Sequence, residues 1–141
     1  MRLLITTPGQ VVVDHADVAA VRAEDETGQF GVWPHHADFV TVLEPSVVSW
    51  RHADGRQGFC AVRRGVLTVA GGAQVSVATR EAVAGDDLAS LEGLVRSRIA
   101  SEAAEERRAR LHAEELRIKA LRQVIGYMRP DAAASAPGKL Q

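Results

Sequence analysis

The stretch VLTVAGGAQVSVA at residues 66–78 decides the fold class. Two short runs rich in valine flank a Gly-Gly pair, and β-branched side chains suit the half-buried surface of a pleated strand. Glycine reaches the positive φ angles of tight hairpin turns, so residues 71–72 predict a turn between two antiparallel strands. Val75 and Val77 alternate with polar neighbours, which indicates one buried and one solvated face.

The same pattern extends back to the start of the chain. Sixteen of the eighteen valines lie at or before Val83. Turn-forming pairs at residues 8–9 and 54–55 separate further short apolar runs, as expected of consecutive strands. We therefore predict an antiparallel β-sandwich over residues 1–84. The runs outside the stretch at 66–78 lie at residues 3–6, 10–13, 47–52 and 57–62.

Beyond residue 84 the chain is built mainly of Ala, Leu, Glu and Arg, which favour helix. Asp86 or Asp87 can cap the first helix. Apolar residues then recur every three or four positions over residues 88–99 and again over 111–128.

A charged window without large apolar side chains separates these two stripes. We predict a two-helix hairpin over residues 85–130 with a bend near 103–109. A single long helix is the alternative, because no Gly or Pro forces the bend. Residues 131–141 have little to bury and are predicted to form a flexible tail.

Composition and charge exclude several classes of function. The chain carries 17 basic and 18 acidic side chains, so it lacks the basic excess typical of nucleic-acid binding. The longest apolar run near the start, residues 3–5, is far shorter than the ~20 residues of a membrane span, so we expect a cytosolic protein without direct membrane insertion. Cys60 is the single cysteine and is expected to fill a buried strand position.

The densest cluster of titratable groups consists of His35, His36 and Asp38. Adjacent histidines on an extended chain point to opposite sides and are poorly placed to ligate one metal ion. A triad of Ser46, His36 and Asp38 has no support from spacing, because triads are defined by three-dimensional geometry. The glycines at residues 28 and 31 lack the context of a phosphate-binding loop. We predict no catalytic, metal-binding or cofactor-binding residues, and hence an interaction protein.

Charge becomes uneven near the end of the helical region. Arg117, Lys119 and Arg122 lie in a stretch without acidic residues. Cations near a helix C-terminus are favourable in themselves, so a solvated helix end is one interpretation. A basic face that meets an acidic partner is the other. The sequence leaves both open.

Three segments resemble the epsilon subunit of bacterial F-type ATP synthases. GQFGVWPHHAD at residues 28–38 is similar to that family's Gly-x-Leu-Gly-x-x-Pro-Gly-His-Ala-Pro segment, and RGVLTV at 64–69 to its Gly-Gly-x-Leu-x-Val strand. Residues 74–87 resemble its exit from the last strand into the helices. These segments follow one another in the same order as in that family, and the resemblance covers about residues 1–128. His35 and Asp38 replace Gly and Pro of the pattern, so a different turn geometry is expected there.

This resemblance implies a ten-stranded sandwich, a helical hairpin and a non-catalytic role in the central rotor stalk, at the cytoplasmic face of the bacterial inner membrane. The sandwich then contacts the gamma subunit and the membrane-embedded c-ring. The helices approach the alpha and beta catalytic subunits and restrain ATP hydrolysis through Arg117, Lys119 and Arg122. The implied interface with gamma or the ring is the loop carrying Gln29 and Phe30 together with the segment at residues 36–42. The residues singled out in it are Gln29, Phe30, Gly31, Pro34, His36, Ala37 and Asp38. The opening MRLLITTP at residues 1–8 resembles the alternate, second-operon type.

Some members of that family bind ATP through a Leu-Asp-x-x-Arg-Ala motif at the start of the first helix. The corresponding residues 88–93 read LASLEG, with Glu92 in place of the arginine. A carboxylate repels phosphate, so we expect no ATP binding. The alternative function is a free-standing β-domain adaptor that dimerises through its helices, which predicts a stable dimer without affinity for a gamma-type subunit.

Overall fold

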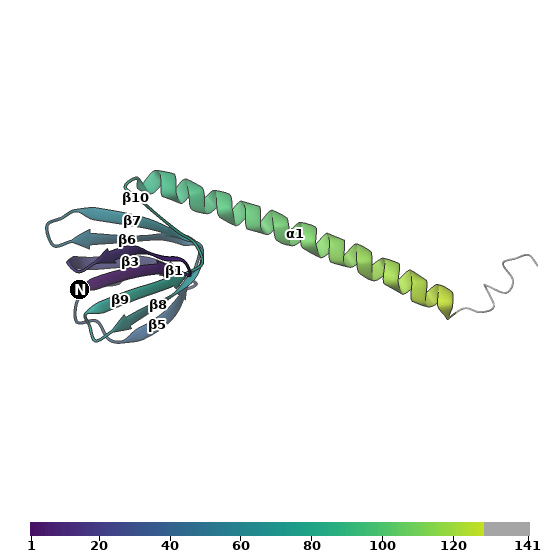
Figure 1. Cartoon of the computed structure of the whole chain (residues 1–141), viewed down its shortest axis with the longest axis horizontal. Coiled ribbons are helices and arrows are strands. Elements are labelled where there is room, and N and C mark those ends of the chain that lie inside the picture. Colours follow the sequence, from purple (N-terminus) through teal and green to yellow (C-terminus); the bar gives the residue numbers. More distant parts are fainter. Residues whose placement is uncertain (129–141) are drawn as a thin grey trace, which may run out of the picture. The chain divides into compact units, whose positions relative to one another are not determined.

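A computed structural model describes residues 1–128 (Figure 1). They form ten strands followed by one helix. The strands predicted from the sequence are confirmed, with bounds that differ by at most two residues. The elements are β1 (Arg2–Thr7), β2 (Gln10–His15), β3 (Val18–Asp25), β4 (Gly28–Val32), β5 (Phe39–Leu43), β6 (Ser46–His52), β7 (Gln57–Val62), β8 (Gly65–Ala70), β9 (Gln74–Thr79), β10 (Ala82–Gly85) and α1 (Leu88–Tyr127).

The strands form one sheet in the order β10-β7-β6-β3-β5-β8-β9-β1-β2, with β4 paired to β3 beside this path. Figure 1 shows β5, β8 and β9 side by side, as this order requires. Within the described residues the strand pairs are antiparallel except β1 with β9, which are parallel. This pair departs from the predicted antiparallel arrangement. A parallel pair needs a long connection, and here the strands between β1 and β9 provide it.

The end strands β2 and β10 approach each other, so the sheet folds around a single apolar core. Val75 and Val77 are buried in it, which confirms the predicted alternation along β9. Each aliphatic side chain of this kind stabilises the fold by about 1.5–3 kcal/mol through its burial. Cys60 is also fully buried, as predicted, and burial raises the pKa of its thiol to about 11.

Residues 88–127 form one continuous helix, so the predicted two-helix hairpin is wrong. The expected bend at residues 103–109 falls on a run of Ala, Glu and Arg, which are strong helix formers. Because this window lacks apolar side chains, the helix has fewer packing partners there, but its backbone hydrogen bonds are unaffected. The single long helix, the alternative reading of the sequence, is the correct one.

Asp87 caps the start of α1, one of the two predicted candidates. Its carboxylate accepts hydrogen bonds from the Ala89 N–H (3.2 Å) and the Ser90 hydroxyl (2.5 Å). Leu91 is buried against Gly85 of β10, and Arg98 pairs with Glu81 at 3.2 Å. These contacts anchor the first turns of the helix on the sandwich.

The chain divides into two compact units, Met1–Ala100 and the residues from Ser101 onward. The predicted tail at 131–141 and the last two residues of the predicted hairpin region lie outside the described residues. No helix in residues 1–128 is long and apolar enough to cross a bilayer.

Candidate functional site

The loop at residues 33–38 joins β4 to β5 and rests on the turn between β8 and β9. The His35 N–H donates to the Gly72 carbonyl at 2.8 Å, and the Asp38 carboxylate accepts from the Gly71 N–H at 2.8 Å. Gly71 and Gly72 have φ angles of 62° and 65°, as the predicted hairpin turn requires. A Cβ at Gly72 would lie only 2.8 Å from His35 Cα, so this close approach needs glycine.

His35 has a φ of 67°, the left-handed region that favours glycine. It occupies the position where the resembled segment has glycine. The histidine thus adopts a conformation that favours glycine, and the expected difference in turn geometry from the family stays a prediction. Such a conformation costs of order 1–3 kcal/mol in a non-glycine residue and persists only where the surroundings hold it. The hydrogen bond to Gly72 supplies that restraint.

Phe39 brings two of the predicted interface residues together. Its ring packs edge-on against Phe30, with centroids 5.7 Å apart, and lies 5.1 Å from the ring of His36. His36 Nδ1–H donates to the Ala37 carbonyl at 2.7 Å. Phe30 and Phe39 are partly buried against the core. The sequence singled out Phe30 and His36, whereas Phe39 was covered only as part of the implied segment at residues 36–42.

The remaining predicted interface residues lie at different depths. Gly31 is half-buried beneath the Trp33 indole, since a Cβ there would lie 2.6 Å from the ring. Pro34, Ala37 and Asp38 are exposed along the loop. They can therefore contact another molecule without any change in the sheet.

A row of exposed valines lies on the neighbouring strands. Val40, Val42 and Val66 are 65%, 60% and 42% exposed, and Val42 is paired with Val66 across β5 and β8. We call these three residues the valine row. Exposed aliphatic side chains grouped on one sheet face indicate an interaction surface more strongly than scattered ones. The backbone hydrogen bonds of the sheet hold the row in place.

Asp25 connects the β3–β4 turn to β5, next to this surface. Its carboxylate accepts hydrogen bonds from the backbone N–H and hydroxyl of Thr27, at 2.9 and 2.6 Å, and from the hydroxyl of Thr41 at 2.8 Å. The bonds from Thr27 and then Thr41 hold the pKa of Asp25 below its ordinary value. The sequence did not single out Asp25 as a turn residue, although an Asp side chain that bonds the backbone N–H two residues further on is a common feature of turns.

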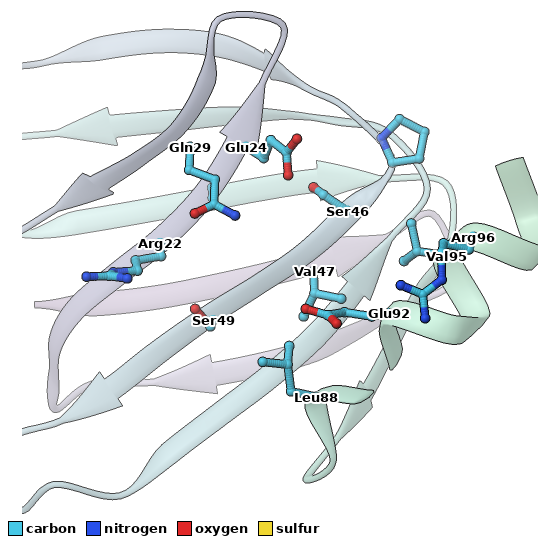
Figure 2. Close-up of a pocket in the computed structure, with 12 residues that line it drawn as sticks. Arg22, Glu24, Gln29, Ser46, Val47, Ser49, Leu88, Glu92, Val95 and Arg96 are labelled. Atoms are coloured by element: carbon cyan, nitrogen blue, oxygen red, sulfur yellow. The ribbon is translucent and has the colours of Figure 1, made fainter. Parts of the chain in front are cut away.

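Gln29 differs from the other predicted interface residues in its surroundings. It lines a pocket of ≈ 320 Å³ between the sheet and the first turns of α1. Figure 2 shows Gln29 with Arg22 and Glu24 from the β3–β4 hairpin, and Glu92 and Arg96 from the helix. Two arginines and two glutamates line this pocket, so its charge is balanced and does not favour a polyphosphate.

The triad considered from the sequence does not form. Ser46 donates its hydroxyl hydrogen bond to the Glu44 carbonyl at 2.8 Å, while His36 and Asp38 bond to the backbone of the loop and of the neighbouring turn. Each of these polar groups thus has a structural partner instead of a catalytic one.

The three basic residues predicted to contact the catalytic subunits are exposed on α1. At about 100° per residue, Arg117 and Arg122 flank an exposed apolar row on opposite sides, and Lys119 lies beyond Arg122. They do not converge on one point. Within residues 1–128 none of the three forms an ion pair, so their charges face solvent. The apolar row consists of Ile118, Leu121, Ile125 and Met128.

Comparison with known proteins gives a consistent result. Residues 1–85 match the family model described as ATP synthase, Delta/Epsilon chain, beta-sandwich domain. The chain is 42% identical to an ATP synthase epsilon chain 2 of Paraburkholderia xenovorans, over 92% of this chain and 94% of the relative. It is 45% identical to an ATP synthase epsilon chain 2 of Cereibacter sphaeroides, over 85% of this chain and 81% of the relative.

Two solved structures share the fold. A chain of the Euglena gracilis mitochondrial ATP synthase aligns with a TM-score of 0.55 and 24% identity, over 58% of this chain and 51% of that chain. A chain of the central stalk and c-ring of the Tetrahymena thermophila mitochondrial ATP synthase aligns with a TM-score of 0.51 and 13% identity, over 59% and 65%. This chain thus spans less than two thirds of either, and at these identities the likeness concerns the fold alone.

Proposed function

From the premise that this chain belongs to the family of ATP synthase epsilon chains, we propose that it is a non-catalytic rotor subunit that couples a gamma subunit to the c-ring. The sandwich, residues 1–84, carries the contacts, and the helical region from residue 85 carries any regulation. The working location is the cytoplasmic face of the bacterial inner membrane. The number 2 in the names of both bacterial relatives supports the alternate, second-operon type.

The valine row is the observation that carries this proposal. A subunit that transmits torque needs several simultaneous contacts on a preformed surface, because a flexible segment yields under load. Val42 and Val66 lie on paired strands, so their separation is fixed before any partner binds. We assign the valine row to the gamma interface.

The loop at residues 33–38 and the adjoining end of β4 extend the proposed interface. Phe30 and His36 pack on Phe39, which restrains the loop before contact and lowers the entropy lost on binding. We propose that the interface with gamma or the ring includes Gln29, Phe30, Gly31, Pro34, His36, Ala37 and Asp38.

The second part of the proposal concerns control of hydrolysis. The exposed apolar row of α1, flanked by Arg117 and Arg122, suits weak docking on an apolar groove with an acidic rim. We propose that these arginines, with Lys119, approach acidic residues of the alpha and beta subunits. Control then requires two helix positions that differ by only a few kcal/mol, so that a ligand or rotor state can select one. We expect no role for ATP bound to this chain.

Val42→Asp tests the proposed gamma interface of the valine row. Binding of the full chain to its gamma subunit is measured by calorimetry. We expect roughly 100-fold weaker binding, because an unpaired carboxylate buried at an interface costs about 3 kcal/mol or more. The matched control is Val11→Asp, since Val11 is 58% exposed but lies on β2. Undiminished binding by the Val42 variant, or an equal loss in both variants, would contradict the assignment.

A further inference from the structure

A second group of side chains meets outside the proposed interface. His15 ends β2, Asp17 lies in the link to β3, and His52 ends β6. One nitrogen or oxygen atom from each residue lies within 4.8 Å of those from the other two. The sequence did not suggest this group, because strand pairing alone brings His52 beside residues some 35 positions earlier.

The backbone holds these residues in place. The Ala53 N–H donates to the Asp17 carbonyl at 3.3 Å, which joins the β6–β7 hairpin to the β2–β3 link. The His52 side chain is only 7% exposed, and its Nδ1 lies 3.0 Å from Asp17 Oδ1. The rings of His15 and His52 meet edge-on, with centroids 4.9 Å apart. Packing therefore fixes both imidazoles, while the exposed Asp17 can rotate.

A cavity of ≈ 550 Å³ adjoins the group, lined by His15, His52 and Trp50 among others. Trp50 is buried, yet its indole N–H has no hydrogen-bond partner within residues 1–128. A buried N–H without a partner costs about 1–3 kcal/mol, so it calls for an explanation. Trp50 lines the cavity, so a water molecule bound there can accept this hydrogen bond.

We propose that His15, Asp17 and His52 bind one divalent transition-metal ion, for which Zn²⁺ has the matching chemistry. Two imidazole nitrogens and a carboxylate oxygen are ordinary zinc ligands, with bonds of about 2.0–2.2 Å and a fourth position for water. Ligand atoms in such a tetrahedral site lie about 3.4 Å apart. His52 Nδ1 and Asp17 Oδ1 are already 3.0 Å apart, and the widest pair, at up to 4.8 Å, needs to close by about 1.4 Å. Asp17 is exposed, so rotation of its carboxylate can supply part of that movement.

The neighbouring charges permit a cation at this position. Arg56 lies 3.6 Å from the second Asp17 oxygen, but its shorter ion pair, 2.7 Å, is with Asp54. Arg56 can therefore release Asp17 and keep a partner. Two carboxylates against one guanidinium leave the immediate surroundings net negative. The bound ion joins the β2–β3 link to the β6–β7 hairpin and stabilises the folded chain, because the unfolded chain lacks the assembled site.

The test is titration of the full chain with ZnCl₂ by calorimetry after removal of metal with EDTA. We expect one ion per chain, with affinity at least roughly tenfold weaker in His15→Asn and in Asp17→Asn. His36→Asn and His112→Asn are the controls and should bind as the unmodified chain does. CoCl₂ gives a second readout, because a Co²⁺ ion bound to imidazole produces a visible absorption spectrum that these two ligand variants should lose.

Asp17 is exposed and its replacement by Asn is nearly isosteric, so this variant should fold, which circular dichroism can verify. Absence of saturable binding in the unmodified chain would overturn the proposal. Binding that survives Asp17→Asn and His15→Asn at full strength, or that is lost in His36→Asn, would overturn it equally. The result does not depend on any partner of the rotor, so it stands or fails separately from the proposed function.

Discussion

Asp25 shows how one carboxylate organises the edge of the proposed interface. It accepts three hydrogen bonds, two from Thr27 and one from Thr41, and these bonds lower its pKa in the folded chain. A lowered folded-state pKa means that the charged form is favoured by folding. The resulting stability is present above the unfolded-state pKa of about 3.9 and is lost as the pH falls through the lower folded-state pKa.

We expect Asp25→Asn to lower the melting temperature of the full chain by a few degrees at pH 7. The difference from the unmodified chain should narrow as the pH drops below about 4, because both chains then carry a neutral side chain at this position. Thermal unfolding followed by circular dichroism between pH 7 and pH 2.5 measures both effects. Glu26→Gln is the control, since Glu26 is an exposed neighbour. A difference that stays constant down to pH 2.5 would refute this role.

At this scale the sequence predicts part of the candidate site. Phe30 and His36 belong to a continuous segment, so a local motif is enough to single them out. Phe39, Val40 and Val42 fall within the implied segment at residues 36–42, but the contacts that they make depend on what lies across the sheet. Val42 pairs with Val66, 24 positions further along the chain, and no local pattern sets that register. The resemblance therefore covered the loop and the following strand, but not the cross-strand partner Val66.

The helix α1 illustrates the limit of periodicity at the scale of an element. Two apolar stripes indicated helix correctly, but the charged window between them did not produce a turn. A helical hairpin needs either a residue that breaks the helix or a tertiary contact that offsets the free-energy cost of the turn. Residues 103–109 contain no helix-breaking residue. Periodicity shows which residues share a helix face, but it does not show whether one apolar stripe packs against the other.

Charge reversal on α1 tests the regulatory proposal. Arg117→Glu combined with Arg122→Glu should raise ATP hydrolysis by the assembled synthase severalfold, because repulsion replaces attraction at an acidic partner surface. The matched control is Arg107→Glu combined with Arg108→Glu, which makes the same charge change at exposed positions of the same helix. Steady-state hydrolysis is measured on complexes shown to contain equal amounts of the subunit. Equal rates of ATP hydrolysis with both variants, whether raised or unchanged, would contradict the proposed regulatory role of Arg117 and Arg122.

At the scale of the whole molecule, a valine-rich sheet and a long helix share one chain but have different properties. The sandwich presents rigid, paired side chains, and the helix from residue 101 onward exposes its apolar row. The order of strands before helix was predicted from composition alone. The parallel pairing of β1 with β9 was not, because it joins the two ends of the sandwich and leaves no mark on either strand.

The exposed apolar row of α1 also suits the alternative function, a free-standing adaptor that dimerises through its helix. The two functions differ in what the full chain binds. Analytical ultracentrifugation of the full chain, alone and with its gamma subunit, separates them most directly. A rotor subunit is predicted to be a monomer alone and to form a 1:1 complex with gamma. A stable homodimer that does not bind gamma would contradict that function.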